Sequence, residues 1–349
     1  MKEIPAGLKI VSVGGGTGLS TLLSGLKAFV GKDSLSQSHS DARWVETLTA
    51  VVTVTDDGGS SGRLREEFQI LPPGDIRNCM AALAEDEHLL TRLFQYRFES
   101  DGHLSGHSFG NLFLAALASV TGDFLEAIKV SSEVLAIKGR IFPSTVEDVA
   151  LVAELEDGRV IQGETSIVES RTPIRRLRLS TDSCSPLPET LDAIKHADLI
   201  TIGPGSLYTS IIPNLLVDRI VDAMCASEAL KVYICNIMTQ PGETDNFDVT
   251  DHLRVLFEYS SNLELDYVVV NTAPIGASLR EKYLADGAAQ VEFESVMRNP
   301  SRLETPERVH SFQLICCDVL YEDGLVRHDP DKLARLILEL HRPQSLAMR

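Results

Sequence analysis

The chain has 349 residues, and its 44% hydrophobic and 23% charged residues are ordinary for a globular protein. The formal net charge of −18 argues against nucleic acid and against an anionic membrane surface as general partners. No apolar run approaches the roughly 20 residues of a spanning helix, and Gly14, Gly15 and Gly16 interrupt the first apolar stretch too early for a signal peptide. We therefore expect a cytoplasmic protein without membrane insertion.

Strand and helix patterns alternate in the first part of the chain. An apolar strand over 8–13 ends in a glycine cluster, and an amphipathic helix over 19–29 follows. The β-branched run 48–55 predicts a strand that is buried on both faces. Helical pattern then dominates residues 75–135 in several pieces.

Residues 149–180 change character. Strand-like pieces within 149–169 flank Asp157-Gly158, a type I′ hairpin signal, and a further piece covers 172–179. Together these pieces predict a small antiparallel excursion.

The alternation then resumes, and it decides the predicted fold class. Strand patterns cover 199–202, 231–236, 267–271 and 312–321, and a closing helix covers 331–341. We predict a Rossmann-like, doubly wound α/β fold with a mainly parallel sheet, because strands that alternate with helices imply right-handed crossovers. The chain is predicted to be one large domain over 1–349, with a small antiparallel insertion around 149–180.

The six cysteines form no CxxC pair and no zinc-type spacing. We therefore predict that all six are reduced core residues: Cys79, Cys184, Cys225, Cys235, Cys316 and Cys317.

The first motif with chemical content is the glycine cluster after the first strand, which contains Gly14, Gly15, Gly16, Thr17 and Gly18. Glycines let the backbone approach a phosphate, and the following helix N-terminus supplies N–H donors and a partial positive charge. A tight turn with positive φ is the alternative, but four glycines in five residues exceed what a turn needs. The dinucleotide fingerprint lacks its third glycine and no Walker lysine follows, so we expect neither NAD nor flavin as a redox cofactor.

The second motif is acidic and follows the next strand. Asp56 and Asp57 stand where carboxylates can hold Mg²⁺ or bond a ribose, and Arg63 lies shortly after them among glycines and serines that suit a phosphate. The alternative is a flexible acidic loop that caps a helix.

The third motif places an arginine at a helix start. After Pro73-Gly74, Asp75 is a natural N-cap, and Arg77 and Asn78 fall in the first turn. A cation at a helix N-terminus interacts unfavourably with the helix dipole, by about 0.3–1 kcal/mol. This cost is easier to understand if the arginine binds an anion.

The fourth motif combines His107, Ser108 and Asn111 at another helix start. His107 is a candidate catalytic acid or base, although a histidine can equally bond a backbone carbonyl. Its polar neighbours favour a ligand contact.

Two later strand ends are similarly polar. One repeats the strand, glycine turn and helix pattern, and the other offers neutral groups that suit hydrogen bonding to a base or sugar. The candidate ligand-binding residues are Gly203, Pro204, Gly205 and Ser206 in the first, and Asn236 and Thr239 in the second.

Six ordered blocks carry a family resemblance: VGGGTGLS, TDDGGSSGRLR, PPGDIRNC, GHSFGNL, GPGSLYTSIIPNLL and CNIMTQPGETDNF. In this order they resemble the YvcK/CofD family, and the gluconeogenesis-factor branch best. The resemblance implies a Rossmann-like fold, binding of uridine-diphosphate sugars, and a role in carbon metabolism, envelope synthesis and cell shape.

The resemblance also implies site residues. It assigns the phosphate cradle to Gly14–Gly18 with Gly203–Ser206, and it places Asp56 at the metal or phosphate end. Asn78, His107, Ser108 and Asn111 would line the pocket, and Tyr283 and Arg327 would be sugar contacts.

Two classes of function follow. The first is a regulator that binds a nucleoside-diphosphate sugar and acts through a shape change or through protein partners. The second is a Mg²⁺-dependent transferase of phosphorus-containing groups, of the 2-phospho-L-lactate transferase kind. A homodimer and regulatory partners are left open by the sequence.

Overall fold

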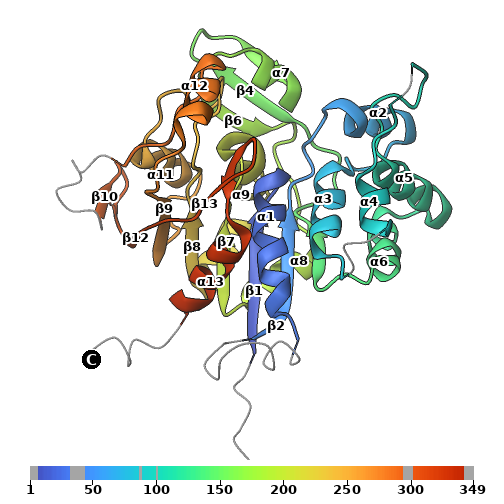
Figure 1. Ribbon diagram of the computed structural model, residues 1–349, viewed down its shortest axis with the longest axis horizontal. Coiled ribbons are helices and arrows are strands. Elements are labelled where there is room, and N and C mark those ends of the chain that lie inside the picture. Colours follow the sequence, from blue (N-terminus) through green and yellow to red (C-terminus); the bar gives the residue numbers. More distant parts are fainter. Residues whose placement is uncertain (1–6, 32–43, 86–88, 100, 294–301, 342–349) are drawn as a thin grey trace, which may run out of the picture.

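A parallel sheet of seven strands forms the centre of the protein (Figure 1). The computed structural model describes residues 7–31, 44–85, 89–99, 101–293 and 302–341. In order across the sheet the strands are β12 (Gln313–Cys317), β9 (Tyr267–Asn271), β8 (Leu230–Ile234), β7 (Leu199–Ile202), β1 (Leu8–Gly14), β2 (Val45–Val52) and β3 (Arg140–Pro143). The predicted α/β fold with a mainly parallel sheet is confirmed.

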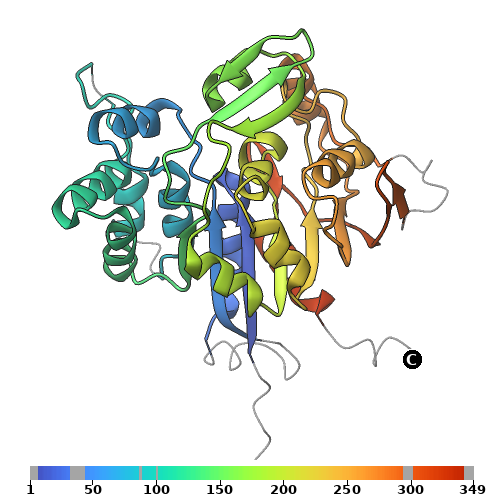
Figure 2. The same ribbon diagram turned by 180° about the vertical axis from the view of Figure 1, so that it is seen from behind.

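The central strands are buried because helices cover both faces of the sheet. In β1 every side chain except that of Lys9 is buried. Figure 1 shows α1 (Gly16–Leu26) and α13 (Pro330–Leu340) in front of the sheet, and Figure 2 shows α8 (Pro188–Lys195) and α10 (Ile220–Ala226) on the opposite face. This two-sided cover explains the nearly continuous apolar strands of the sequence.

The C-terminal helix packs closely against the first helix. A Cβ at Gly25 of α1 would lie 2.0 Å from the carbonyl oxygen of Pro330. Only glycine permits this approach, so α1 and the segment that leads into α13 are held backbone to backbone. The strand β14 (Val326–His328) precedes this segment and also contacts α1, where it lines a common cavity with Thr17, Gly18 and Thr21.

A group of five helices lies beside β2 and β3 (Figure 1). They are α2 (Gly59–Phe68), α3 (Gly74–Leu83), α4 (Leu89–Gln95), α5 (Phe109–Thr121) and α6 (Phe124–Val134). Beyond β7 and β8 the chain adds the short helices η3 (Leu207–Ile211) and α9 (Ile212–Leu215), and then α11 (Val249–Glu258) and α12 (Ala277–Ala285). None of the helices in the described part of the chain has the length and apolar character of a membrane span.

The predicted antiparallel excursion is present as a separate sheet. Its strands are β4 (Leu151–Leu155), β5 (Val160–Gln162) and β6 (Ile174–Leu179), in the order β5-β4-β6. The expectation of strand up to residue 169 is wrong, because the chain turns at Gly163 (φ 100°) and forms α7 (Glu164–Glu169).

Other predicted boundaries shift by a few residues. The first helix begins at Gly16 rather than at 19, because the last glycines of the cluster form its first turn, and it continues after Leu26 as the 3₁₀ turn η1 (Lys27–Phe29). The predicted strand 312–321 is in fact β12 followed by β13 (Leu320–Glu322), which pairs with β14. A two-stranded ribbon, β10 (Arg302–Glu304) and β11 (Val309–Ser311), precedes β12.

The prediction that all cysteines lie in the core is wrong for three of them. All six are free thiols, and Cys79, Cys184 and Cys235 are buried. Cys225 and Cys316 are exposed and Cys317 is half-buried. Cys225 lies in the last turn of α10, and Cys316 and Cys317 belong to the edge strand β12, which has a neighbour on one side only.

Candidate functional site

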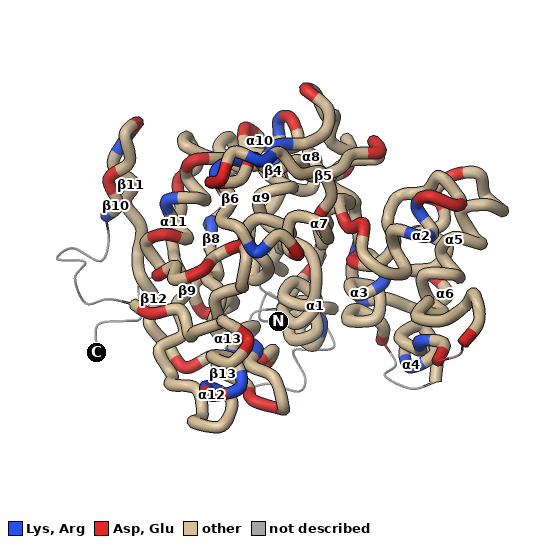
Figure 3. The backbone as a smooth tube through the Cα atoms, turned by 90° about the horizontal axis from the view of Figure 1, so that it is seen from above, with Lys and Arg blue, Asp and Glu red and all other residues tan. Residues whose placement is uncertain are grey.

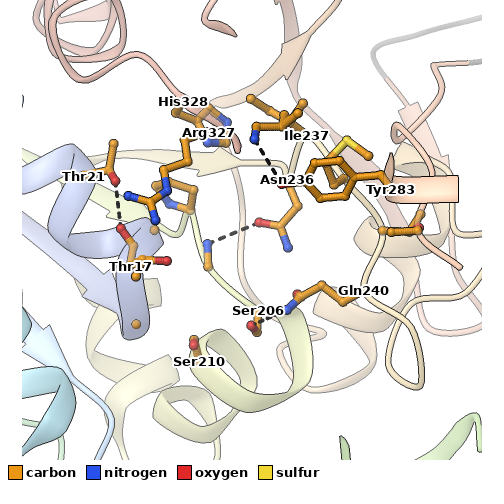
Figure 4. A pocket seen from close by; sticks show the side chains of 18 of the residues that line it. Thr17, Thr21, Ser206, Ser210, Asn236, Ile237, Gln240, Tyr283, Arg327 and His328 are labelled. Atoms are coloured by element: carbon orange, nitrogen blue, oxygen red, sulfur yellow. Dashed lines mark hydrogen bonds between the residues drawn. The ribbon is translucent and has the colours of Figure 1, made fainter. Parts of the chain in front are cut away.

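A pocket of about 370 Å³ lies at the carboxyl ends of β1, β7 and β8. Its walls are the loops that follow these strands, with α12 and β14 at the far side (Figure 4). Of the residues singled out in the sequence, it gathers Gly15, Gly16, Thr17, Gly18, Pro204, Gly205, Ser206, Asn236, Thr239, Tyr283 and Arg327. We call it the nucleotide pocket, and Gly14 and Gly203 lie directly behind its wall at the ends of their strands.

The glycines of the first loop have distinct tasks. Gly15 is the N-cap of α1 in extended conformation, and Gly16 has φ 61°, in the left-handed region that favours glycine. A Cβ at Gly18 would lie 2.5 Å from the carbonyl oxygen of Pro204, so Gly18 lets the first and second glycine loops touch. The first N–H groups of α1 lack acceptors within the helix; that of Gly16 donates to the carboxylate of Asp75, and Thr17 and Gly18 line the pocket.

The second glycine loop is fixed from two sides. The N–H of Gly205 donates to Oδ1 of Asn236 at 3.3 Å, and Nε2 of Gln240 donates to Oγ of Ser206 at 2.7 Å. Asn214 donates from Nδ2 to the carbonyl oxygen of Gly14 at 3.0 Å, which ties α9 to the first loop. The two loops thus form one rigid wall.

The opposite wall comes from the C-terminal part of the chain. The hydroxyl of Tyr283 in α12 accepts a hydrogen bond from the N–H of Val326 at 3.0 Å, which fixes the ring beside Arg327. Asp286 and His328 also line the pocket, and the sequence analysis missed both. Asp286 precedes Gly287 (φ 87°) in a turn after α12, and His328 has no glycine beside it; neither shows its role locally, because the wall is assembled only when β14 folds back onto α1.

Charge in the pocket is sparse. Among the described residues that line it, Arg327 is the single Lys or Arg and Asp286 the single Asp or Glu. Figure 3 shows Asp and Glu residues over all parts of the described chain. An anion bound here would therefore depend on the backbone N–H groups of the glycine loops for most of its local positive potential.

A second group of polar residues lies on the other side of the N-terminus of α1. Here a Cβ at Gly15 would be 2.6 Å from Oδ2 of Asp75, and a Cβ at Gly74 would be 2.6 Å from Oδ2 of Asp56. Burial, and next the charge of Asp56, raise the pKa of Asp75 to about 6. We call Asp56 and Asp75, with the residues hydrogen-bonded around them, the carboxylate cluster.

The predicted N-cap role of Asp75 is wrong. Helix α3 begins at Gly74 after Pro73, so Asp75 stands in the first turn and its side chain faces the loop of Gly15. Asn78 donates a hydrogen bond to Asp75 from the same helix.

A chain of hydrogen bonds connects α3, α5 and α2. Nε of Arg77 donates to Oδ1 of Asn111 at 3.2 Å, and Nδ2 of Asn111 donates to Oγ of Ser60 at 3.1 Å. Ser60 Oγ and His107 Nδ1 share a hydrogen bond at 3.0 Å, and Ser108 accepts from the N–H of Asn111 as the N-cap of α5. All five side chains are buried, and burial lowers the pKa of His107, followed by the charge of Arg63.

The remaining predicted residues lie at the edge of the cluster. Asp57 Oδ1 accepts hydrogen bonds from the N–H and the hydroxyl of Thr165, both at 2.8 Å, so its carboxylate faces α7. Arg63 is exposed and donates to the carbonyl oxygen of Ser105 at 2.8 Å. Glu164 of α7 was missed, and burial, followed by the charge of Asp56, raises its pKa well above the usual range.

A model of the CofD family, described as 2-phospho-L-lactate transferase CofD, matches residues 10–307. The chain belongs to the YvcK/CofD family. The gluconeogenesis factor of Bacillus subtilis is 46% identical over 332 residues, which cover 95% of this chain and 98% of that protein.

Further relatives agree. The gluconeogenesis factor of Halalkalibacterium halodurans is 43% identical over 330 residues, which cover 95% of this chain and 95% of that protein. A crystal structure of a UPF0052 family member from Bacillus halodurans superposes with a TM-score of 0.85 at 42% identity, covering 96% of this chain and all of the other. The predicted family and its gluconeogenesis-factor branch are confirmed.

Proposed function

We propose that this protein binds a nucleoside-diphosphate sugar, in particular a uridine-diphosphate sugar, in the nucleotide pocket. The observation that carries the proposal is the direct contact of the two glycine loops at Gly18 and Pro204. This contact joins two strand-to-helix turns into one wall, and N–H groups at such turns are the backbone's ordinary means of holding a diphosphate.

The far wall supports a sugar or nucleoside at the other end. Tyr283 offers a ring face, Arg327 a cation, and Asp286 a carboxylate that can accept hydrogen bonds from hydroxyl groups. The pocket thus combines donors for phosphate oxygens with acceptors for a polyol, a combination that suits a nucleotide sugar.

We infer a regulatory role because few ionisable groups face the pocket. Within it, Asp286, Arg327 and His328 are the described lining residues with charged or titratable side chains apart from Tyr283. The name of the gluconeogenesis-factor relatives favours a role in carbon metabolism, and we extend this proposal to envelope synthesis and cell shape in the cytoplasm. A regulatory protein of this kind acts by changing its conformation when the ligand binds, or by binding protein partners, including a second copy of the chain.

Mg²⁺ is the metal that the cluster would suit. No group of three potential metal-ligating residues occurs in the part of the chain that the structure describes. Magnesium in nucleotide sites is commonly held by one or two carboxylates together with substrate phosphates. Asp56 and Asp75 fit that mode, since burial and then the charge of Asp56 raise the pKa of Asp75, and a cation would relieve the repulsion between the two carboxylates. Asp57 is directed to Thr165 instead.

The second candidate is a transferase of the 2-phospho-L-lactate transferase kind. It is favoured by the carboxylate cluster, whose Asp75 lies against Gly15 at the N-terminus of α1, and by His107, which is linked to α2 through Ser60 and lies outside the nucleotide pocket. A second substrate on that side would meet the phosphate end of a bound nucleotide. His107 is then the candidate acid or base.

Calorimetric titration with nucleotide sugars and dinucleotides, with and without Mg²⁺, tests the proposal. We expect saturable binding of uridine-diphosphate sugars at one site per chain. Preference for a dinucleotide such as NAD, or no binding of any nucleotide sugar, would contradict it.

A further inference from the structure

Three arginine side chains gather around the loop that leads into α5. Nη2 of Arg63 in α2 donates to the carbonyl oxygen of Ser105 at 2.8 Å, and Nη1 of Arg97 donates to the carbonyl oxygen of Gly106 at 3.0 Å. Arg77 of α3 packs against the first turn of α5. These elements lie together beside β2 and β3 (Figure 1), and none of the three arginines lines the nucleotide pocket.

Arg77 is a buried cation with unused donors. It is 7% exposed, and a Cβ at Gly110 would lie 2.7 Å from its Cγ, so a glycine of α5 makes room for it. Nε donates to Asn111, but Nη1 and Nη2 have no hydrogen-bond partner among the described residues. Neither nitrogen is closed off from solvent. The buried side chain therefore ends at the molecular surface with donors that a ligand can use.

No carboxylate neutralises these cations. Arg63, Arg77 and Arg97 form no ion pair within the described part of the chain, although the net charge of the protein is −18. Burial, and next the charge of Arg97, lower the pKa of Arg77, and the charges of Asp75 and Asp56 oppose this more weakly. Guanidinium groups keep their protons in proteins, so a bound anion would relieve the repulsion between them.

His107 adds a neutral donor from the same loop. It is 6% exposed, and burial, followed by the charge of Arg63, lowers its pKa against a weaker effect of Glu67. Oγ of Ser60 already accepts from Asn111 and has no other described acceptor, so its hydroxyl donates to Nδ1 and the ring proton lies on Nε2. Nε2 has no described partner and is not closed off from solvent, unlike one ring nitrogen in each of three other buried histidines.

We propose that these three arginines, together with Nε2 of His107, bind the phosphate group of a second ligand outside the nucleotide pocket. We call them the arginine site. Guanidinium groups form paired hydrogen bonds to phosphate oxygens, and a dianion suits several cations that lack a carboxylate partner. The group can belong to a small phosphomonoester or be a free phosphate ion, because both present the same oxygens. This inference goes beyond the proposed function and does not depend on it.

Calorimetric titration with inorganic phosphate, with potassium chloride holding the ionic strength constant, tests the arginine site. We expect Arg97→Gln and Arg77→Gln each to weaken phosphate binding about tenfold, because each removes a charge-assisted hydrogen bond. Arg97→Lys keeps the charge and should lose less than Arg97→Gln. Arg92→Gln is the matched control, because it removes an exposed arginine of α4. It should bind phosphate within about twofold of wild type.

Two further measurements separate this site from other effects. Gly16→Val alters the glycine loop of the nucleotide pocket and should leave phosphate binding at the arginine site unchanged. Melting temperatures without phosphate check folding, and the exposed Arg97 keeps the test valid if the buried Arg77 cannot be replaced without unfolding. Glycerol 3-phosphate is titrated in parallel. Tighter binding of glycerol 3-phosphate assigns the site to a phosphomonoester, and tighter binding of inorganic phosphate assigns it to the free ion.

Three results would overturn the proposal. The first is equal phosphate affinity of wild type and folded Arg97→Gln, or no binding of either phosphate compound by wild type. The second is an equal loss in Arg92→Gln and Arg97→Gln, which would indicate a general effect of net charge. The third is a loss in Gly16→Val alone, which would place the phosphate at the glycine loops. Binding of UDP-glucose is measured separately, so the proposed function stands or fails independently of these results.

Discussion

The nucleotide pocket and the carboxylate cluster share one helix N-terminus but have opposite chemistry. The pocket is built from glycine backbone and neutral polar groups, with one exposed arginine. The cluster places the half-buried carboxylates of Asp56 and Asp75 beside a hydrogen-bonded chain that contains a buried arginine and a histidine. We infer from this difference that binding and chemistry are spatially separate: no residue of the cluster lines the pocket, although Asp75 accepts a hydrogen bond from the N–H of Gly16 at their common boundary.

The largest expected effect comes from filling the pocket at its phosphate end. Gly16→Val should abolish measurable binding of UDP-glucose, a loss of at least about a thousandfold, because the side chain projects towards Ser210 across the phosphate cradle. The left-handed backbone (φ 61°) should also cost about 1–2 kcal/mol of stability. Calorimetry and urea denaturation measure the two effects separately.

Gly122 offers a matched control for that substitution. It has φ 72°, lies after α5, and a Cβ there would meet nothing within 4 Å. Gly122→Val should lose comparable stability but keep its affinity for UDP-glucose. Equal affinity of Gly16→Val and Gly122→Val for UDP-glucose would show that the loop of Gly16 does not bind the phosphates.

The next effect concerns a carboxyl beneath the pocket. Glu243 is buried and accepts hydrogen bonds from Thr209, and burial raises its pKa from 4.5 to about 7. Between these values the folded protein holds a proton that the unfolded chain has released. The free energy of unfolding therefore falls as pH rises through this window, by about 3 kcal/mol for this group.

Glu243→Gln removes that titration. The variant should be more stable than wild type at pH 8 by about 1–3 kcal/mol and nearly equal to it at pH 4.5. Urea denaturation at both pH values measures the difference, with the exposed Glu189→Gln as control. A variant that is less stable at pH 8 would mean that the Glu243 carboxylate is stabilising in its charged form.

We expect the Mg²⁺ dependence of ligand affinity to come from the carboxylate cluster and not from the residues that line the nucleotide pocket. We expect Mg²⁺ to raise the affinity for UDP-glucose about tenfold in wild type and to have little effect in Asp56→Asn and Asp75→Asn, because the cation would bridge these carboxylates and the phosphates. Asp57→Asn is the control. It should retain the Mg²⁺ response and lose stability through the bonds to Thr165. A response that disappears only in Asp57→Asn would reassign the metal.

The smallest effect is expected for His107. It is not among the lining residues of the pocket, so His107→Ala should change the affinity for UDP-glucose by less than about threefold. A loss similar to that of Gly16→Val would show that the ligand extends into the cluster. The two regions would then form one site.

The sequence predicts the parallel strands and the glycine loops well, because buried β-branched runs and glycine clusters are local signals. Because Gly16, Gly205 and Asn236 each follow a predicted parallel strand, the sequence also predicts that these residues meet, although they are far apart in the chain. The helix over 164–169 was missed because a positive-φ glycine, rather than side-chain pattern, ends the preceding strand.

Three site residues could not be found by local reasoning. Asp75 reads as an ordinary N-cap, and its contact with Gly15 depends on how α3 meets α1. Asp286 and His328 enter the pocket only through the packing of α12 and β14 across it. Residues whose roles depend on the meeting of distant elements leave no periodic or motif signal in the chain.

The most direct test of the central claim, that the protein reads a nucleotide sugar rather than transforming it, follows the fate of the bound ligand. Purified protein is incubated with UDP-glucose or guanosine-diphospho-lactate, Mg²⁺ and candidate acceptors, and the products are analysed by mass spectrometry. We predict that UDP-glucose binds stoichiometrically and is recovered intact. A site that binds the ground state and the transition state equally tightly does not accelerate the reaction. Catalytic formation of a product that disappears in His107→Ala would contradict this claim and establish the transferase.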